Sequence, residues 1–233
     1  MFASFIQELI WQGISEHTIA VLLFLPIVAA LVTFSRYVIG WKSLNIFSTV
    51  LMTFALYELG RMSDGTISII NGFIQGTILT FFVTLTALLV QKFTKNVRLH
   101  QLSKVSMILS FTTIVILGLL YIGTAVDFSL RPINSIAVLI IVLVVDVFIR
   151  MYIRKGWRKA IKLLANTMTL SFFIFAIIAQ PSLKYFVLAH PEVVLLTLLI
   201  DVILGRWKHL RFTELIRFRN ISLKEQENAE DSS

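Results

Sequence analysis

Long apolar runs separated by short polar stretches dominate this chain. Runs with few or no charged residues recur seven times, and a helix needs about 20 such residues to cross a bilayer. The seven runs are Thr18–Ser35, Ser43–Tyr57, Gly65–Gln91, Val105–Val126, Pro132–Ile149, Leu163–Leu183 and Tyr185–Gly205. The pattern predicts an all-α, polytopic membrane protein, folded as a seven-transmembrane-helix bundle.

Two of the seven predicted spans are weaker than the others. The second, Ser43–Tyr57, is short, and the seventh contains His190, Pro191, Glu192 and Asp201. Basic residues support counting the seventh, because they concentrate on the cytoplasmic side of membrane proteins. With seven spans and the N-terminus outside, 18 of the 21 lysines and arginines fall on one side. We therefore expect an outer N-terminus and a cytoplasmic C-terminus.

The same pattern divides the chain into three expected parts. Residues 1–18 form an N-terminal amphipathic segment, with apolar residues at helical spacing. Residues 19–205 form the seven-helix membrane domain. Residues 206–233 form a cytoplasmic tail that is first basic and then acidic.

Composition excludes several classes of protein. With 57% hydrophobic and only 15% charged residues, the chain lacks the polar surface of a soluble domain. It has no cysteine and only four scattered histidines, so we expect neither a metal site nor a cofactor. The net charge of +8 indicates a membrane surface and not a nucleic acid. Zinc-protease, Walker and nucleophile-elbow motifs are missing, which predicts that the chain is not an enzyme.

The third span carries a stripe of small or hydroxyl residues at every fourth position. Its members are Ser68, Gly72, Gly76, Thr80 and Thr84. The two glycines form a GxxxG pair, which allows two helix backbones to approach closely. Helix packing inside the bundle is the favoured interpretation. A homo-oligomer contact and a surface facing a substrate are the alternatives.

Polar residues within the spans form a candidate intramembrane site. Asp146 and Asp201 lie in similar sequence contexts, each followed by an arginine about one turn later. Arg150 stands four residues after Asp146, which favours an interfacial ion pair. A proton or solute relay that also uses Asn166 is the alternative, since carboxylates at bilayer depth are commonly functional.

Other polar residues have simpler interpretations. The hydroxyls of Thr167, Thr169 and Ser171 are expected to hydrogen bond between helices. Glu58 and Arg61, at the outer end of the second span, are expected to pair or to line a vestibule. Basic residues at the inner surface are candidate contacts for anionic lipid, an acidic partner or an acidic product. They are Arg154, Lys155, Arg158, Arg206, Arg211, Arg217 and Arg219.

Two stretches carry a resemblance to a known family. The last span and tail read LGRWKHLRFTELIRFR over residues 204–219, and the first span contains LPIVAA at residues 25–30, followed by Arg36. Together they resemble the bacterial seven-helix domain that is usually fused to an inactive transglutaminase-like domain, over about residues 24–219. Two departures stand out. Ser48 and Thr49 occupy a region where the family tends to have proline, and we expect this chain to be a stand-alone version.

The resemblance implies a function. Family members are non-catalytic membrane components, and they tend to be encoded beside an ATP-grasp ligase similar to peptide–glutamate ligases. The chain is therefore expected to be a scaffold in a bacterial inner membrane. Its expected partners are an ATP-grasp amide ligase and an outer transglutaminase-like protein. A proton-coupled or small-solute transporter that uses Asp146 and Asp201 is the main alternative, and a seven-helix sensor is the least favoured.

Overall fold

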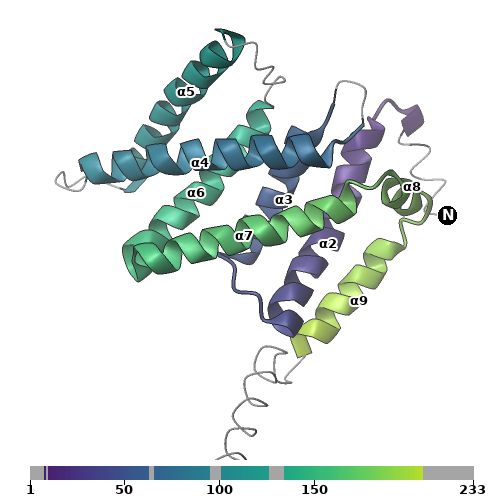
Figure 1. The fold of residues 1–233 in the computed structure, drawn as a ribbon. Coiled ribbons are helices and arrows are strands. Elements are labelled where there is room, and N and C mark those ends of the chain that lie inside the picture. Colours follow the sequence, from purple (N-terminus) through teal and green to yellow (C-terminus); the bar gives the residue numbers. More distant parts are fainter. Residues whose placement is uncertain (1–7, 9, 63–65, 95–100, 126–133, 207–233) are drawn as a thin grey trace, which may run out of the picture. The chain divides into compact units, whose positions relative to one another are not determined.

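The computed structural model describes residues 8, 10–62, 66–94, 101–125 and 134–206 (Figure 1). Helices make up nearly all of these residues, which confirms the all-α prediction. In chain order they are α2 (Glu16–Phe34), the π-helical segment η1 (Ser35–Ile39), α3 (Ile46–Gly60), α4 (Ile69–Thr94), α5 (Gln101–Ala125), α6 (Ser135–Lys155), α7 (Trp157–Ile178), α8 (Pro181–Ala189) and α9 (Val193–Arg206).

Within the described residues, four stretches are long and apolar enough to span a bilayer unaided. They are Glu16–Ile39, Ile69–Phe93, Ser135–Lys155 and Trp157–Ile178. Helix α3 and the stretch Ser106–Gly118 of α5 are apolar but shorter, and α8 and α9 together make one broken apolar stretch. Large hydrophobic side chains also lie exposed along most of these helices. The chain is therefore a multi-pass membrane protein.

The chain divides into two compact units. Unit 1 comprises Met1–Lys42 and His190–Ser233, and unit 2 comprises Ser43–Ala189. Within unit 1, α2 packs against α9, and the two helices run in the same direction (Figure 1). A common direction is what the sequence predicts for the first and the seventh apolar segments.

Helix α3 is the centre of unit 2. It packs against α4, α6 and α7. Its buried residues include Met52, Ala55, Leu56 and Tyr57, each 1% exposed or less. A helix of 15 residues is about 22 Å long, which is less than the roughly 30 Å of a hydrocarbon core. Because neighbouring helices surround α3, its short length leaves little backbone facing lipid.

Contacts between these helices fix their relative directions. The Asn134 side chain, at the start of α6, donates a hydrogen bond to Glu58 at the end of α3. Gly72, near the start of α4, lies against the final turns of α3. The amide of Leu44, just before α3, bonds to Thr167 in the first half of α7. Helices α3 and α7 therefore run one way and α4 and α6 the other, as consecutive membrane crossings require.

The seventh apolar segment is broken near its start. Tyr185–Gly205 is not one continuous span, because α8 ends at Ala189 and α9 begins at Val193. The cause is local. Pro191 has no amide hydrogen to donate, and its ring disfavours helical geometry at the residue before it. The residues between the two helices form turns, in which the Val193 amide donates to the His190 carbonyl and the Val194 amide donates to the Pro191 carbonyl.

Candidate functional site

One carboxylate of the candidate polar site has a partner on its own helix. An Asp146 carboxylate oxygen lies 2.8 Å from a guanidinium nitrogen of Arg150, one turn further along α6. The Asp146 side chain is 14% exposed and that of Arg150 is 46% exposed. The guanidinium group of Arg150 neutralises the Asp146 carboxylate and stays partly exposed. Long cationic side chains commonly extend toward the polar surroundings in this way near helix ends.

The other candidate residues of that site lie on other helices. Asn166 is half-buried on α7 in unit 2. Asp201 belongs to α9 and therefore to unit 1. Its Oδ1 atom is buried, and none of the described residues hydrogen bonds to it. Thus the structure brings Asp146 and Arg150 together and assigns Asp201 to the other unit.

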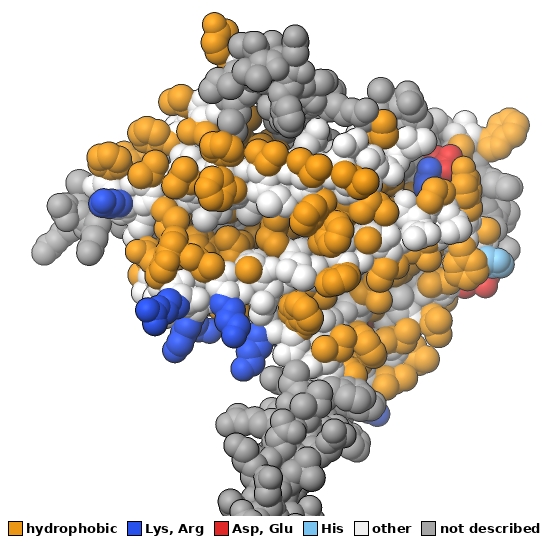
Figure 2. Space-filling model, viewed as in Figure 1, with side chains coloured by type: hydrophobic (Ala, Val, Ile, Leu, Met, Phe, Trp, Pro, Cys, Tyr) orange, Lys and Arg blue, Asp and Glu red, His pale blue; other side chains and the backbone are white. Residues whose placement is uncertain are grey.

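Five cations gather where α6 turns into α7, and we call this set the basic corner. It consists of Arg154, Lys155, Arg158, Lys159 and Lys162, all exposed (Figure 2). Gly156 makes the turn with a φ of +80°, a left-handed conformation that glycine adopts without strain. Two helix ends therefore present their charges side by side.

Several predicted sites lie beyond the part of the chain that the structure describes. Arg211, Arg217 and Arg219 fall in residues 207–233, outside the described residues, whereas Arg206 is the exposed last residue of α9. Residues 1–7 and 9 of the predicted amphipathic N-terminal segment also lie outside them. Their roles stay predictions.

The small-residue stripe of α4 lies against α3. A Cβ atom added at Gly72 would be 2.7 Å from the Leu56 carbonyl oxygen and 2.8 Å from the Phe175 ring. One added at Gly76 would be 2.2 Å from a Leu56 methyl group. Both glycines are buried, so this part of the stripe is occupied inside the chain and is not free for a second copy.

The hydroxyl residues at the two ends of the stripe differ from the glycines in burial and hydrogen bonding. Ser68 receives a 3.4 Å hydrogen bond from the amide of Asn71 at the start of α4. Thr80 is buried and Thr84 half-buried. The hydroxyl oxygens of both threonines have no hydrogen-bond partner among the described residues.

Hydroxyl groups of α7 link it to the α3 region. The Ser171 hydroxyl donates to the Thr49 carbonyl at 3.0 Å, which confirms the predicted interhelical bond. Thr167 accepts from the Leu44 amide at 2.9 Å and donates to the Leu163 carbonyl. The bond from Leu44 to Thr167 satisfies a buried backbone amide that lipid cannot.

The sequence interpretation missed a cross-link at the other end of α3. Asn134 caps α6 by accepting a bond from the Ile136 amide, and its Nδ2 donates to Glu58 at 3.0 Å. The available signal was an asparagine directly before a long apolar run, which is typical of a helix N-cap. The pairing expected for Glu58 concerned Arg61, not this residue.

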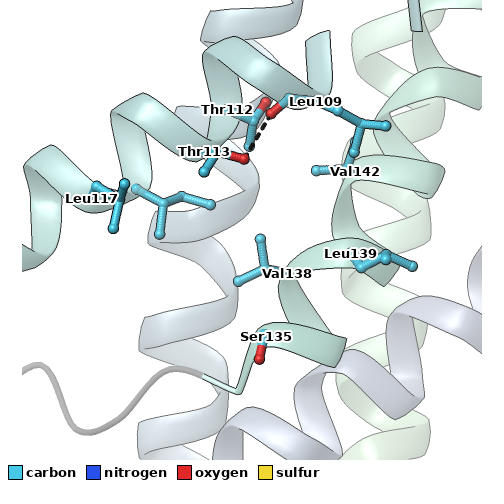
Figure 3. A pocket seen from close by; sticks show the side chains of 9 residues that line it. Leu109, Thr112, Thr113, Leu117, Ser135, Val138, Leu139 and Val142 are labelled. Carbon is cyan, nitrogen blue, oxygen red and sulfur yellow. Dashed lines mark hydrogen bonds between the residues drawn. The ribbon is translucent and has the colours of Figure 1, made fainter. Parts of the chain in front are cut away.

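A cavity of about 330 Å³ separates α5 from α6 (Figure 3). Its lining is mainly aliphatic, with hydroxyls from Thr112, Thr113 and Ser135. The Thr113 hydroxyl already bonds to the Leu109 carbonyl at 3.0 Å. Among the described residues no charged side chain lines this cavity, so they offer none of the groups that would recognise a charged substrate.

The chemistry available to the described residues is limited. Within the described ranges, no group of three or more histidine, aspartate or glutamate side chains could hold a metal ion. The polar contacts given above join helices or neutralise a carboxylate. The arrangement suits the assembly of a membrane bundle.

Comparison of the sequence with known protein families identifies one match. Residues 12–222 match a family described as seven transmembrane helices usually fused to an inactive transglutaminase. No curated protein matches the chain, and no solved structure matches it. The family match covers most of the 233 residues and agrees with the apolar helices described above. The chain therefore belongs to this family of seven-transmembrane-helix domains.

Proposed function

We propose that this protein is a non-catalytic membrane scaffold. It joins a cytosolic ATP-grasp amide ligase to an outer transglutaminase-like protein, in the inner membrane of a bacterium. The observation that carries the proposal is the family's usual fusion to an inactive transglutaminase. A domain that is normally joined to another protein domain has a partner to hold, and an inactive partner points to assembly and not to catalysis.

The packing of unit 2 supports a scaffold. Polar groups between its helices are used in bonds such as Ser171 to Thr49 and Asn134 to Glu58. Close glycine contacts join α4 to α3. Such a bundle is suited to holding a fixed shape, because these contacts all depend on one arrangement of the helices.

Orientation follows from the charges in the same proposal. The basic corner and Arg206 face the cytosol, the N-terminus is outside, and the basic tail contacts the ligase. Residues 1–18 lie at the outer surface, residues 19–205 form the membrane domain, and residues 206–233 form the tail.

Cysteine labelling with a membrane-impermeant reagent tests this orientation, because the chain has no cysteine of its own. Thr66→Cys probes the outer α3–α4 connection, and Lys155→Cys probes the inner turn. In intact spheroplasts the first variant should react, and the second should react only after lysis. The reverse pattern contradicts the proposed orientation.

Co-purification tests the scaffold proposal. Tagged full-length protein, isolated from its native host in a mild detergent, should retain an ATP-grasp ligase or a transglutaminase-like protein, identified by mass spectrometry. Deleting residues 212–233 should remove the ligase, and deleting only the acidic residues 225–233 is the matched control. A protein that purifies alone, at full yield and correctly folded, contradicts the proposal.

A carrier is the second candidate, and one observation favours it. The broken α8–α9 segment and the Oδ1 of Asp201, which has no hydrogen-bond partner among the described residues, resemble the discontinuous helices and buried carboxylates of transporters. In proteoliposomes with a pH-sensitive dye inside, a carrier should show proton flux that Asp146→Asn with Asp201→Asn abolishes. Asp231→Asn makes the same chemical change in the tail and is the control. Undiminished flux in the double variant contradicts this candidate.

A further inference from the structure

The basic corner has cations that no described acid of its unit neutralises. The acidic residues described in unit 2 are Glu58 and Asp146. Asp146 pairs with Arg150, and Glu58 lies at the opposite end of α6, where it bonds to Asn134. The five exposed cations of the corner therefore remain accessible to an anion from outside the described part of the unit.

Helix stability does not account for these charges. Cations in the last turn of α6, at Arg154 and Lys155, interact favourably with the helix dipole, but Arg158 and Lys159 lie in the first turn of α7. The N-terminus of a helix carries a partial positive charge, so cations there are unfavourable. Gly156 provides no side-chain cap to offset this. An anion bound beside the cations of α7 would offset this unfavourable interaction.

Exposed apolar side chains lie among the same cations. Ile153 is 60% exposed, Trp157 48% and Ile161 39%. The Trp157 ring packs edge-on against Tyr152, with ring centroids 5.8 Å apart. Indole and phenol rings favour the level of lipid headgroups. A surface that combines cations with such side chains fits a bilayer interface better than the water-facing surface of a protein partner.

We infer that the basic corner binds the headgroup phosphates of anionic phospholipids. Arg154, Lys155, Arg158, Lys159 and Lys162 provide the positive charge, and Trp157 with Ile153 and Ile161 provides contact with the adjoining acyl chains. This inference requires only that the chain spans a membrane. It is independent of the ligase and of the transglutaminase-like protein.

Trp157 is a built-in reporter of the lipid beside the corner. The chain has four tryptophans, so Trp11→Phe, Trp41→Phe and Trp207→Phe leave Trp157 as the only indole. The protein is reconstituted in equimolar phosphatidylglycerol and phosphatidylcholine, with bromine on the acyl chains of one lipid or the other. Bromine quenches indole fluorescence at short range, so the ratio of the two quenching efficiencies reports which lipid is enriched at the corner.

We expect quenching by the brominated anionic lipid to correspond to an enrichment of about fivefold, the ratio for one lysine–headgroup contact. The variant Arg158→Gln, Lys159→Gln, Lys162→Gln should lower the ratio, and adding Arg154→Gln and Lys155→Gln should bring it close to one. Replacing Lys159 and Lys162 by arginine keeps the positive charge and should keep the enrichment. Arg61→Gln with Lys184→Gln removes cations elsewhere on unit 2 and should leave the ratio unchanged.

Circular dichroism and size-exclusion chromatography establish that each variant is folded. Equal quenching by the two lipids around the unmodified corner overturns the inference. An enrichment that survives glutamine at all five positions of the basic corner also overturns it, because the selectivity then arises elsewhere. Loss of an acidic co-purifying protein from that variant, without any lipid selectivity, assigns the corner to a protein contact and overturns the lipid site.

Discussion

Two helix contacts in unit 2 differ sharply in how they are packed. Helix α4 meets α3 through Gly72 and Gly76, with atoms of α3 and α7 close enough that no Cβ fits at Gly72 without displacement. Helices α5 and α6 meet around a cavity of about 330 Å³. At Gly118 of α5, an added Cβ would have no atom of the described residues within 4 Å. Both contacts join apolar helices of similar composition, so hydrophobicity does not explain the difference.

The comparison shows that side-chain size at the contact decides packing between apolar helices. Lipid tails are as apolar as leucine, so helices in a bilayer gain little from burying leucine against leucine. Close approach of two backbones, which small residues allow, supplies the van der Waals contact. The α3–α4 contact has that property along one stripe, whereas mainly aliphatic side chains line the cavity between α5 and α6.

The largest expected effect comes from adding one methyl group at the close contact. Gly72→Ala places a Cβ against the Leu56 carbonyl, which is backbone and cannot rotate away. We expect a loss of stability of about 1–3 kcal/mol or more, as for overpacked cores. Gly76→Ala should cost less, because the nearest atom is the end of a leucine side chain.

Gly118→Ala is the control for both glycine substitutions. Its added methyl group meets no described atom within 4 Å, and alanine favours a helix over glycine by up to about 1 kcal/mol. It should therefore be neutral or stabilising. Thermal unfolding midpoints in detergent measure all three variants. If Gly72→Ala and Gly118→Ala shift the midpoint equally, the close packing described at Gly72 does not limit stability.

Adjacent residues of α6 offer the next test. Ala137 is fully buried in the core cluster, whereas Val138 lines the α5–α6 cavity. Ala137→Leu should destabilise by about 1–3 kcal/mol through overpacking, and Val138→Leu should be close to neutral because it extends into empty space. The same unfolding measurement ranks them. A severe loss from Val138→Leu would show that the cavity is not available to a larger side chain.

An effect of equal or smaller size is expected from the hydroxyls that join α7 to the α3 region. Thr167→Val leaves the buried Leu44 amide without its acceptor, at a cost of about 1–3 kcal/mol. Ser171→Ala removes a bond to a carbonyl that keeps its helical partner, and such interhelical bonds average about 0.6 kcal/mol. Thr169→Val is the control, since its hydroxyl is exposed and bonds within α7. A larger loss from Ser171→Ala than from Thr167→Val contradicts this ranking.

The smallest effect belongs to the ion pair. Asp146 and Arg150 form an i,i+4 pair with a half-exposed arginine, and such pairs contribute about 0.3–0.5 kcal/mol. A double-mutant cycle of Asp146→Asn and Arg150→Gln on unfolding free energy measures the coupling. A coupling well above about 1 kcal/mol, the upper end for exposed pairs, would show that the pair is shielded from water and does more than neutralise an interfacial carboxylate.

Much of the fold was predictable because the bilayer imposes simple rules. A spanning helix needs a long apolar run, and such runs placed most of the helices within a few residues of their observed bounds. The spacing of Gly72 and Gly76 also identified a packing face before its partner was known. The polar residues His190–Glu192 mark the seventh run as weak, but whether that run is continuous is decided only by the structure, which ends α8 at Ala189 and begins α9 at Val193.

The sequence by itself determined the class of this protein, the approximate bounds of its helices and the asymmetry of its charges, because hydropathy and charge act on each segment separately. Only the tertiary structure decided that α3 is central, that Asn134 bonds to Glu58 and that Phe175 lies beside Gly72. A helix that is apolar on every side carries no polar face to indicate its neighbour. Its partners are selected by shape, and shape exists only once the helices have packed.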